Sequence, residues 1–266
     1  MQAALPPLPS LGAVPSFMAT ADWVAWIMLG LFLGILLVAG VFLLLAKRHL
    51  RKRRGQHSVN GTGTPAQSLA PSMNLPNCWL AIRSVNTAAI QQALELGNTQ
   101  RCTWAEGVAA SEGGRLFITP PVQGWTLVMG APLPSPEEDA DLCFHFLVHL
   151  SHELGHVQFF SHNAALSHHA WVRAHNGHIE RAYAWAGETL WHQGTVTPAE
   201  TLLRLRHHPY GQSLEDLPYG DLPGLAHNTE MVPLLAAHWG VDPAAHALRG
   251  QQEPGTLGEW LAARSA

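Results

Sequence analysis

Hydrophobic residues are concentrated most strongly at residues 23–46. This segment reads WVAWIMLGLFLGILLVAGVFLLLA and contains no charged residue. A helix needs about 20 residues to cross a bilayer core of about 30 Å, and a core helix is rarely apolar on every face. The run therefore predicts a single transmembrane helix, preceded by a short extracytoplasmic N-terminus at residues 1–22. The alternative, a signal peptide, would carry its basic residues before the apolar stretch.

The orientation of this helix follows from a basic juxtamembrane cluster at residues 47–54, which contains six Lys and Arg residues. Lys and Arg that flank a membrane helix stay on the cytoplasmic side, so the rest of the chain is predicted to face the cytoplasm. Residues 55–76 are rich in Gly, Ser, Thr, Asn and Pro and show no apolar period. This composition predicts a flexible linker.

The remaining residues, 77–266, mix two hydrophobic periods and predict one α+β domain. Alternating or continuous apolar stretches predict strands at 78–83, 115–119, 124–129, 156–161, 169–175 and 178–185. The last two flank Asn176–Gly177, a strong hairpin signal. Helices are predicted at 86–96 (with Gly97 as its C-terminal cap), from Ser135, from Thr197, at 229–239 and from Thr256. This order predicts an antiparallel or mixed sheet flanked by helices.

The longest predicted helix of this domain has a clear start and stop in the sequence. Ser135 is the predicted N-cap, Pro136 occupies the first helical position and Glu138 completes a capping box. Gly155 lies where the apolar period ends and is the predicted C-terminal cap. The same capping-box pattern starts the predicted helices at Thr197–Glu200 and Thr256–Glu259.

The charge of the domain restricts what it can bind. After residue 77 the chain has nine Arg, no Lys and 18 Asp or Glu, so it lacks the excess of basic side chains that a phosphate backbone requires. Nucleic acid is therefore excluded as a partner. The three cysteines show no CxxC spacing and predict reduced, buried thiols rather than a disulfide framework.

Several stretches of this domain resemble an uncharacterised family of bacterial proteins. They are CWLAIRS at 78–84, FITPPVQGW at 117–125, HHAW at 168–171, RAYAWAGETLW at 181–191 and VPLLAAHWGVDP at 232–243. The resemblance covers roughly residues 78–245; it implies one globular domain, and it assigns no catalytic residue because no activity is established for that family. Together with the topology signal, a bacterial chain implies the inner membrane as the location.

One short motif is typical of zinc hydrolases. His152-Glu153-Leu154-Gly155-His156 fits HExxH, in which two histidines one helical turn apart bind zinc and the glutamate acts as general base. Glu180 or Glu188 would be the third ligand. A helix that ends at Gly155 would separate His152 from His156, and this favours a non-catalytic interpretation.

The chain is also rich in histidine, with 17 residues. His145, His149, His152 and His156 are spaced as one stripe of a helix, a pattern that can bind Zn²⁺ or Ni²⁺. A solvated helix face that uses histidine is the favoured explanation, and a pH-sensing role is a further alternative.

Five tryptophans and one loop are the other candidates for a binding surface. The tryptophans are typical of a core or a half-buried sheet: Trp125, Trp171, Trp185, Trp191 and Trp239. Gly187-Glu188-Thr189 and the polar run His192-Gln193-Gly194 are candidates for a functional loop.

The sequence thus favours a non-enzymatic binding module without a cofactor, tethered to inner-membrane lipid through residues 23–46 and acting on a protein partner. The alternative is a membrane-anchored zinc hydrolase, with Zn²⁺ on His152 and His156 and Glu153 as the base.

Overall fold

A computed structural model describes residues 76–260 together with Met28, Leu29, Leu31 and Phe32. The chain divides into two units, residues 1–68 and 69–266. The four described residues of the first unit are helical. The rest of the predicted span at 23–46, with the predicted segments 1–22, 47–54 and nearly all of 55–76, lies outside the described residues. Of the helices that the structure describes, none combines the length and apolar character needed to cross a bilayer.

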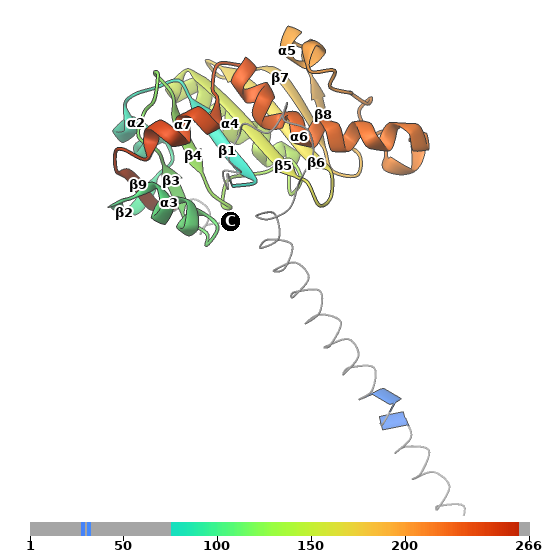
Figure 1. The fold of residues 1–266 in the computed structure, drawn as a ribbon, viewed down its shortest axis with the longest axis horizontal. Helices are drawn as coiled ribbons and strands as arrows, with labels where there is room; N and C mark the ends of the chain where they lie inside the picture. Colours follow the sequence, from blue (N-terminus) through green and yellow to red (C-terminus); the bar gives the residue numbers. More distant parts are fainter. Residues whose placement is uncertain (1–27, 30, 33–75, 261–266) are drawn as a thin grey trace, which may run out of the picture. The chain divides into compact units, whose positions relative to one another are not determined.

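The described part of the second unit is an α+β domain built on one antiparallel sheet (Figure 1). Its strands are β1 (Cys78–Ile82), β2 (Leu96–Cys102), β3 (Leu116–Ile118), β4 (Thr126–Met129), β5 (His156–Asn163), β6 (His168–His175), β7 (His178–Trp185), β8 (Thr189–Gln193) and β9 (Gly255–Trp260). Their order in the sheet is β2-β9-β3-β4-β1-β5-β6-β7-β8, and every pairing is antiparallel. The α+β prediction is confirmed, and the sheet is antiparallel rather than mixed.

Helices cover both faces of this sheet. They are α2 (Thr87–Ala93), α3 (Trp104–Ser111), α4 (Ala140–Leu154), α5 (Pro198–Leu202), α6 (Leu222–His238) and α7 (Pro243–Gly250), with 3-10 turns at Leu214–Asp216 and Tyr219–Asp221. One face packs on α4 and α2, and the other on α3, α5 and α6. Figure 1 shows α6 and α7 crossing the strands on one side.

Alternation along the strands explains the two cores. Trp79 and Ala81 of β1 belong to the core under α6, whereas Leu80 and Ile82 of the same strand belong to the core under α4. Successive side chains of a strand point to opposite faces, so a central strand buried on both sides reads as a continuous apolar run. All five tryptophans assigned to the core are less than 10% exposed, as predicted.

Two local predictions in the middle of the domain are confirmed. Asn176 and Gly177 have φ angles of 48° and 81° and join β6 to β7, as the type I′ hairpin turn requires. Gly155, with a φ of 82°, ends α4, and its backbone N–H donates to Ser151 O at 2.9 Å. The strand β5 begins at the next residue.

Two predicted helix boundaries, the start of α4 and the end of α2, are wrong. The helix α4 begins at Ala140 rather than near Pro136, because Asp139 caps it and accepts from Leu142 N at 2.9 Å. Ser135 instead accepts backbone hydrogen bonds from Glu138 and Asp139 in a preceding turn. The helix α2 ends at Ala93, and Gly97 lies inside β2.

The predicted C-terminal helix from Thr256 is also wrong, because this segment is β9, which lies between β2 and β3 in the sheet. Tertiary pairing on both edges outweighs the local capping pattern there. Four further elements were not predicted: β2, α3, β8 and α7. The helix predicted at 229–239 exists, but as α6 it begins earlier, at Leu222.

Candidate functional site

The fold separates the two histidines of the HExxH motif. His152 lies in the last turn of α4, and His156 is the first residue of β5. The turn at Gly155 changes the chain direction between them, so they do not share a helical face. This is the geometry that favoured a non-catalytic interpretation of the motif.

The other residues of the predicted zinc site are engaged elsewhere. Glu153 is exposed and pairs with His149 at 3.3 Å. Glu180 pairs with Arg173 at 3.4 Å and with His175 at 3.7 Å. Within the described residues, no three His, Cys, Asp or Glu side chains are placed to share one metal ion.

The predicted histidine stripe lies along the outer surface of α4. His145, His149 and His152 are exposed, whereas Leu147 and Leu150 of the same helix are buried. His156 leaves the stripe because it belongs to β5, where its ring packs edge-on against Trp125 at 5.2 Å. Burial lowers the pKa of His156, so this side chain favours the neutral form.

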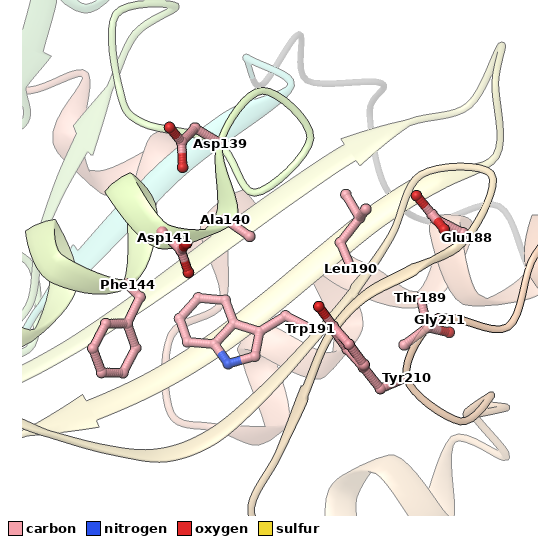
Figure 2. A pocket seen from close by; sticks show the side chains of 10 residues that line it. All are labelled: Asp139, Ala140, Asp141, Phe144, Glu188, Thr189, Leu190, Trp191, Tyr210 and Gly211. Carbon is pink, nitrogen blue, oxygen red and sulfur yellow. The ribbon is translucent and has the colours of Figure 1, made fainter.

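The structure points instead to a cavity of about 390 Å³ at the start of α4 (Figure 2). Three segments that are distant in the sequence form it: the first turn of α4, the β7–β8 turn with β8, and the loop after α5. The lining residues are Asp139, Ala140, Asp141, Phe144, Glu188, Thr189, Leu190, Trp191, Tyr210 and Gly211.

The carboxylates of this pocket come from two of its walls. Asp139 and Asp141 lie at the N-terminus of α4, where negative charge is stabilised by the helix dipole. Glu188 lies on the β7–β8 turn, which Gly187 makes possible with a φ of 81°. The lining includes no Lys, Arg or His, so the pocket is acidic.

The aromatic rings of the pocket differ in exposure. Trp191 of β8 is 8% exposed and packs edge-on against Phe144 of α4, with ring centroids 5.8 Å apart. Its indole N–H donates to Gln193 Oε1 at 3.1 Å. Tyr210, on the third segment, is 76% exposed. Phe144 and Trp191 are therefore held by packing against each other, whereas Tyr210 lies on the outer surface.

Hydrogen bonds from Thr189 hold two walls of the pocket together. Its backbone N–H donates to Gln212 O at 3.0 Å, and Gly211 N donates back to Thr189 O at 3.0 Å. Its hydroxyl donates to His208 O at 3.2 Å. Because the strand β8 and the loop 208–212 are linked at three points, this wall is preorganised for binding.

A second hollow, of about 600 Å³, lies between α2 and α4. It is lined by Glu95, Glu153 and His149 together with small or aliphatic groups and Gln92, and it contains no Phe, Tyr or Trp. The pocket at the start of α4 offers both charge and ring faces, so it is the better candidate for a specific ligand.

On the sheet face opposite to α4, under α5, a buried ion pair joins the helix to the sheet. Glu200 is 0% exposed and Arg181 of β7 is 1% exposed, and Arg181 Nη2 donates to Glu200 Oε1 at 2.8 Å. The same carboxylate accepts from Trp171 Nε1, from His207 Nε2 and from Thr197 N at 2.7–2.9 Å. Burial opposes ionisation of this carboxyl, but the hydrogen bonds outweigh it and hold the pKa of Glu200 well below its usual range.

The sequence indicated these residues only in part. Glu188 and Thr189 stood in a predicted functional loop, and Glu188 was a candidate zinc ligand. Asp139, Asp141 and Tyr210 carried no signal, because nothing local shows that a helix start, a β-turn and a later loop meet. Glu200 was recognised as a capping residue, and its Thr197 box is present, but its burial was not foreseen.

No family model, no curated protein and no solved structure matches this chain.

Proposed function

We propose that this protein is a membrane-tethered binding module, whose cytoplasmic domain holds a positively charged segment of a protein partner. The pocket at the start of α4 carries this proposal, because it combines three carboxylates with three aromatic rings. Lys and Arg side chains pair with carboxylates and stack on ring faces, and this lining offers both contacts within one cavity.

The size and charge of the domain support a peptide-like partner. A cavity of about 390 Å³ accommodates one or two side chains rather than a large folded surface. The net negative charge of the domain sequence adds a long-range attraction that raises the association rate of a basic partner. The tether would concentrate this interaction at the inner membrane.

A peptide titration tests the pocket. We expect the full-length protein, in detergent, to bind a fluorescent peptide with an Arg-Lys pair more tightly than the same peptide with Glu at both positions. Asp141→Asn with Glu188→Gln should weaken binding roughly 2–30-fold, since exposed ion pairs contribute about 0.2–1 kcal/mol each. Fluorescence anisotropy at low and moderate salt measures the affinity, and salt should weaken it.

The second hollow provides the matched control. Glu95→Gln with Glu153→Gln also removes two negative charges from the domain, but it removes them from the hollow between α2 and α4. This double variant should bind the basic peptide with nearly the original affinity. An equal loss in both double variants would show a general charge effect and would contradict the pocket assignment.

A reporter fusion tests the tether and its orientation. The basic cluster at residues 47–54 should keep the C-terminus in the cytoplasm. A reporter that is active only in the cytoplasm should therefore function when fused after Ala266, and one that requires export should not. Activity of the exported reporter would overturn the orientation, and recovery of the fusion without membranes would overturn the tether.

A further inference from the structure

Two histidines stand side by side on the ring of Tyr183, on the sheet face that packs on α5 and α6. His192 belongs to β8, and His207 lies on the loop that follows α5. Both rings meet Tyr183 edge-on, with centroid distances of 5.6 Å and 4.9 Å and interplanar angles of 89° and 85°. Their own centroids are 6.0 Å apart, and their planes differ by 32°.

One nitrogen of each ring is already committed to an oxygen acceptor. His207 Nε2 lies 2.9 Å from the Glu200 carboxylate, and His192 Nδ1 lies 3.2 Å from the backbone oxygen of His208. Carboxylate and carbonyl oxygens accept hydrogen bonds only, so these nitrogens carry the protons. The lone pair of each neutral ring is then on the other nitrogen, which is His207 Nδ1 and His192 Nε2.

We propose that His192 and His207 form a binding site for a divalent transition metal ion, with zinc as the best fit. Metal-binding histidines almost always donate their second ring N–H to a carboxylate or a backbone carbonyl, which fixes the tautomer and the ring orientation. Here His207 donates to the carboxylate of Glu200, and His192 donates to the backbone oxygen of His208. Water or a group of a bound partner would complete the coordination.

The rings lie somewhat farther apart than a tetrahedral ion would hold them, so metal binding would draw them together. With zinc–nitrogen bonds of about 2.0–2.1 Å, a tetrahedral ion would hold two imidazole centroids roughly 5 Å apart. The observed separation is 6.0 Å. His192 is exposed, and the His207 side chain is 11% exposed, so the pair lies at the protein surface. Arg181 lies nearby, but Glu200 balances its charge.

The position of the ion suggests what it would do. His192 directly follows Trp191 of the pocket, and His207 precedes Tyr210 and Gly211 on the opposite loop. An ion bound by both histidines would clamp β8 to the 207–211 loop, which are two walls of the pocket. Metal binding and occupation of the pocket are therefore expected to favour each other.

Zinc and cobalt titrations of the full-length protein test the site. Competition with a chromophoric zinc indicator counts the ions bound, and cobalt absorption reports nitrogen coordination. We expect His192→Ala to lose one equivalent of zinc or to bind it at least about tenfold more weakly. Removing a residue that only hydrogen-bonds to a metal ligand already lowers metal affinity about 10–100-fold. His192 is exposed, so this variant should keep its fold.

The histidine stripe of α4 is the matched control, because the chain has many other histidines. His145→Ala with His149→Ala removes two exposed histidines one helical turn apart and should leave that equivalent of zinc unchanged. A wild-type protein that binds no zinc, or a His192→Ala variant with unchanged stoichiometry and affinity, would overturn the proposal. Loss of the equivalent in the α4 variant alone would also overturn it, because the ion would then lie on that helix.

Discussion

Replacing Glu200 with alanine should lower the free energy of unfolding by roughly 3–5 kcal/mol, the typical cost of removing one partner of a buried ion pair. The variant leaves the guanidinium of Arg181 buried at 1% exposure without its counter-ion. It also removes the acceptor of three further donors, from Trp171, His207 and Thr197. Urea denaturation followed by tryptophan fluorescence measures the change.

Glu106 provides a matched control for this prediction. Both glutamates are the third helical residue of a capping box, Glu106 with Thr103 and Glu200 with Thr197. The side chain of Glu106, however, faces solvent and has no buried cation beside it. Glu106→Ala should therefore cost much less than Glu200→Ala. Equal losses in the two variants would show that capping, rather than the buried pair, accounts for the stability that Glu200 provides.

These two glutamates show what the sequence could and could not predict. The Thr197–Glu200 capping box was predicted because it depends on residues three apart, and the structure confirms it. The burial of Glu200 depends on Arg181 of β7 and on Trp171 of β6. Which strands lie beneath a short helix is a property of the tertiary fold, and no local pattern specifies it.

The same distinction explains the predicted helix boundaries. The turns at Gly155 and Asn176–Gly177 are correct because a positive φ angle is a local requirement that glycine and asparagine meet. The segment from Thr256 has an equally clear local signal, yet it forms β9 between β2 and β3. Pairing on both edges supplies backbone hydrogen bonds to two neighbours, and this overrides the capping pattern.

The pocket is the feature that the sequence predicts least well. Its carboxylates come from the start of α4 and from the turn after β7, and Tyr210 comes from a third segment. Of its lining residues, Glu188 and Thr189 belonged to the predicted loop and Trp191 to the five candidate tryptophans. The histidine stripe of α4 is visible in the sequence because its spacing is regular, whereas His192 and His207 are 15 residues apart and are brought together by β8 and a loop. Regular spacing reveals helical faces, and a site shared by a strand and a loop leaves no such trace.

Gly194 immediately follows β8, and its replacement by alanine should be the most damaging of the glycine substitutions beside the proposed metal site. Its φ of 75° is a left-handed conformation that costs a residue with a side chain about 1–2 kcal/mol. An added Cβ would also collide with the backbone oxygen of Glu180 and lie 3.2 Å from the Cα of Arg181. Such overpacking typically adds about 1–3 kcal/mol, so we expect a total loss of roughly 2–5 kcal/mol.

Gly187 separates the cost of the backbone conformation from the cost of the steric collision. It has a similar φ of 81°, but an added Cβ there would have no neighbour within 4 Å. Gly187→Ala should therefore show the conformational cost alone, about 1–2 kcal/mol, in the same urea denaturation experiment. The difference between the variants measures how closely the chain after β8 is pressed against β7, where Arg181 Nη1 donates to Gln193 O at 3.0 Å. If Gly194→Ala cost no more than Gly187→Ala, the end of β8 would be free to move away from β7. The buried pair of Arg181 and Glu200 would then not depend on a fixed position of that strand.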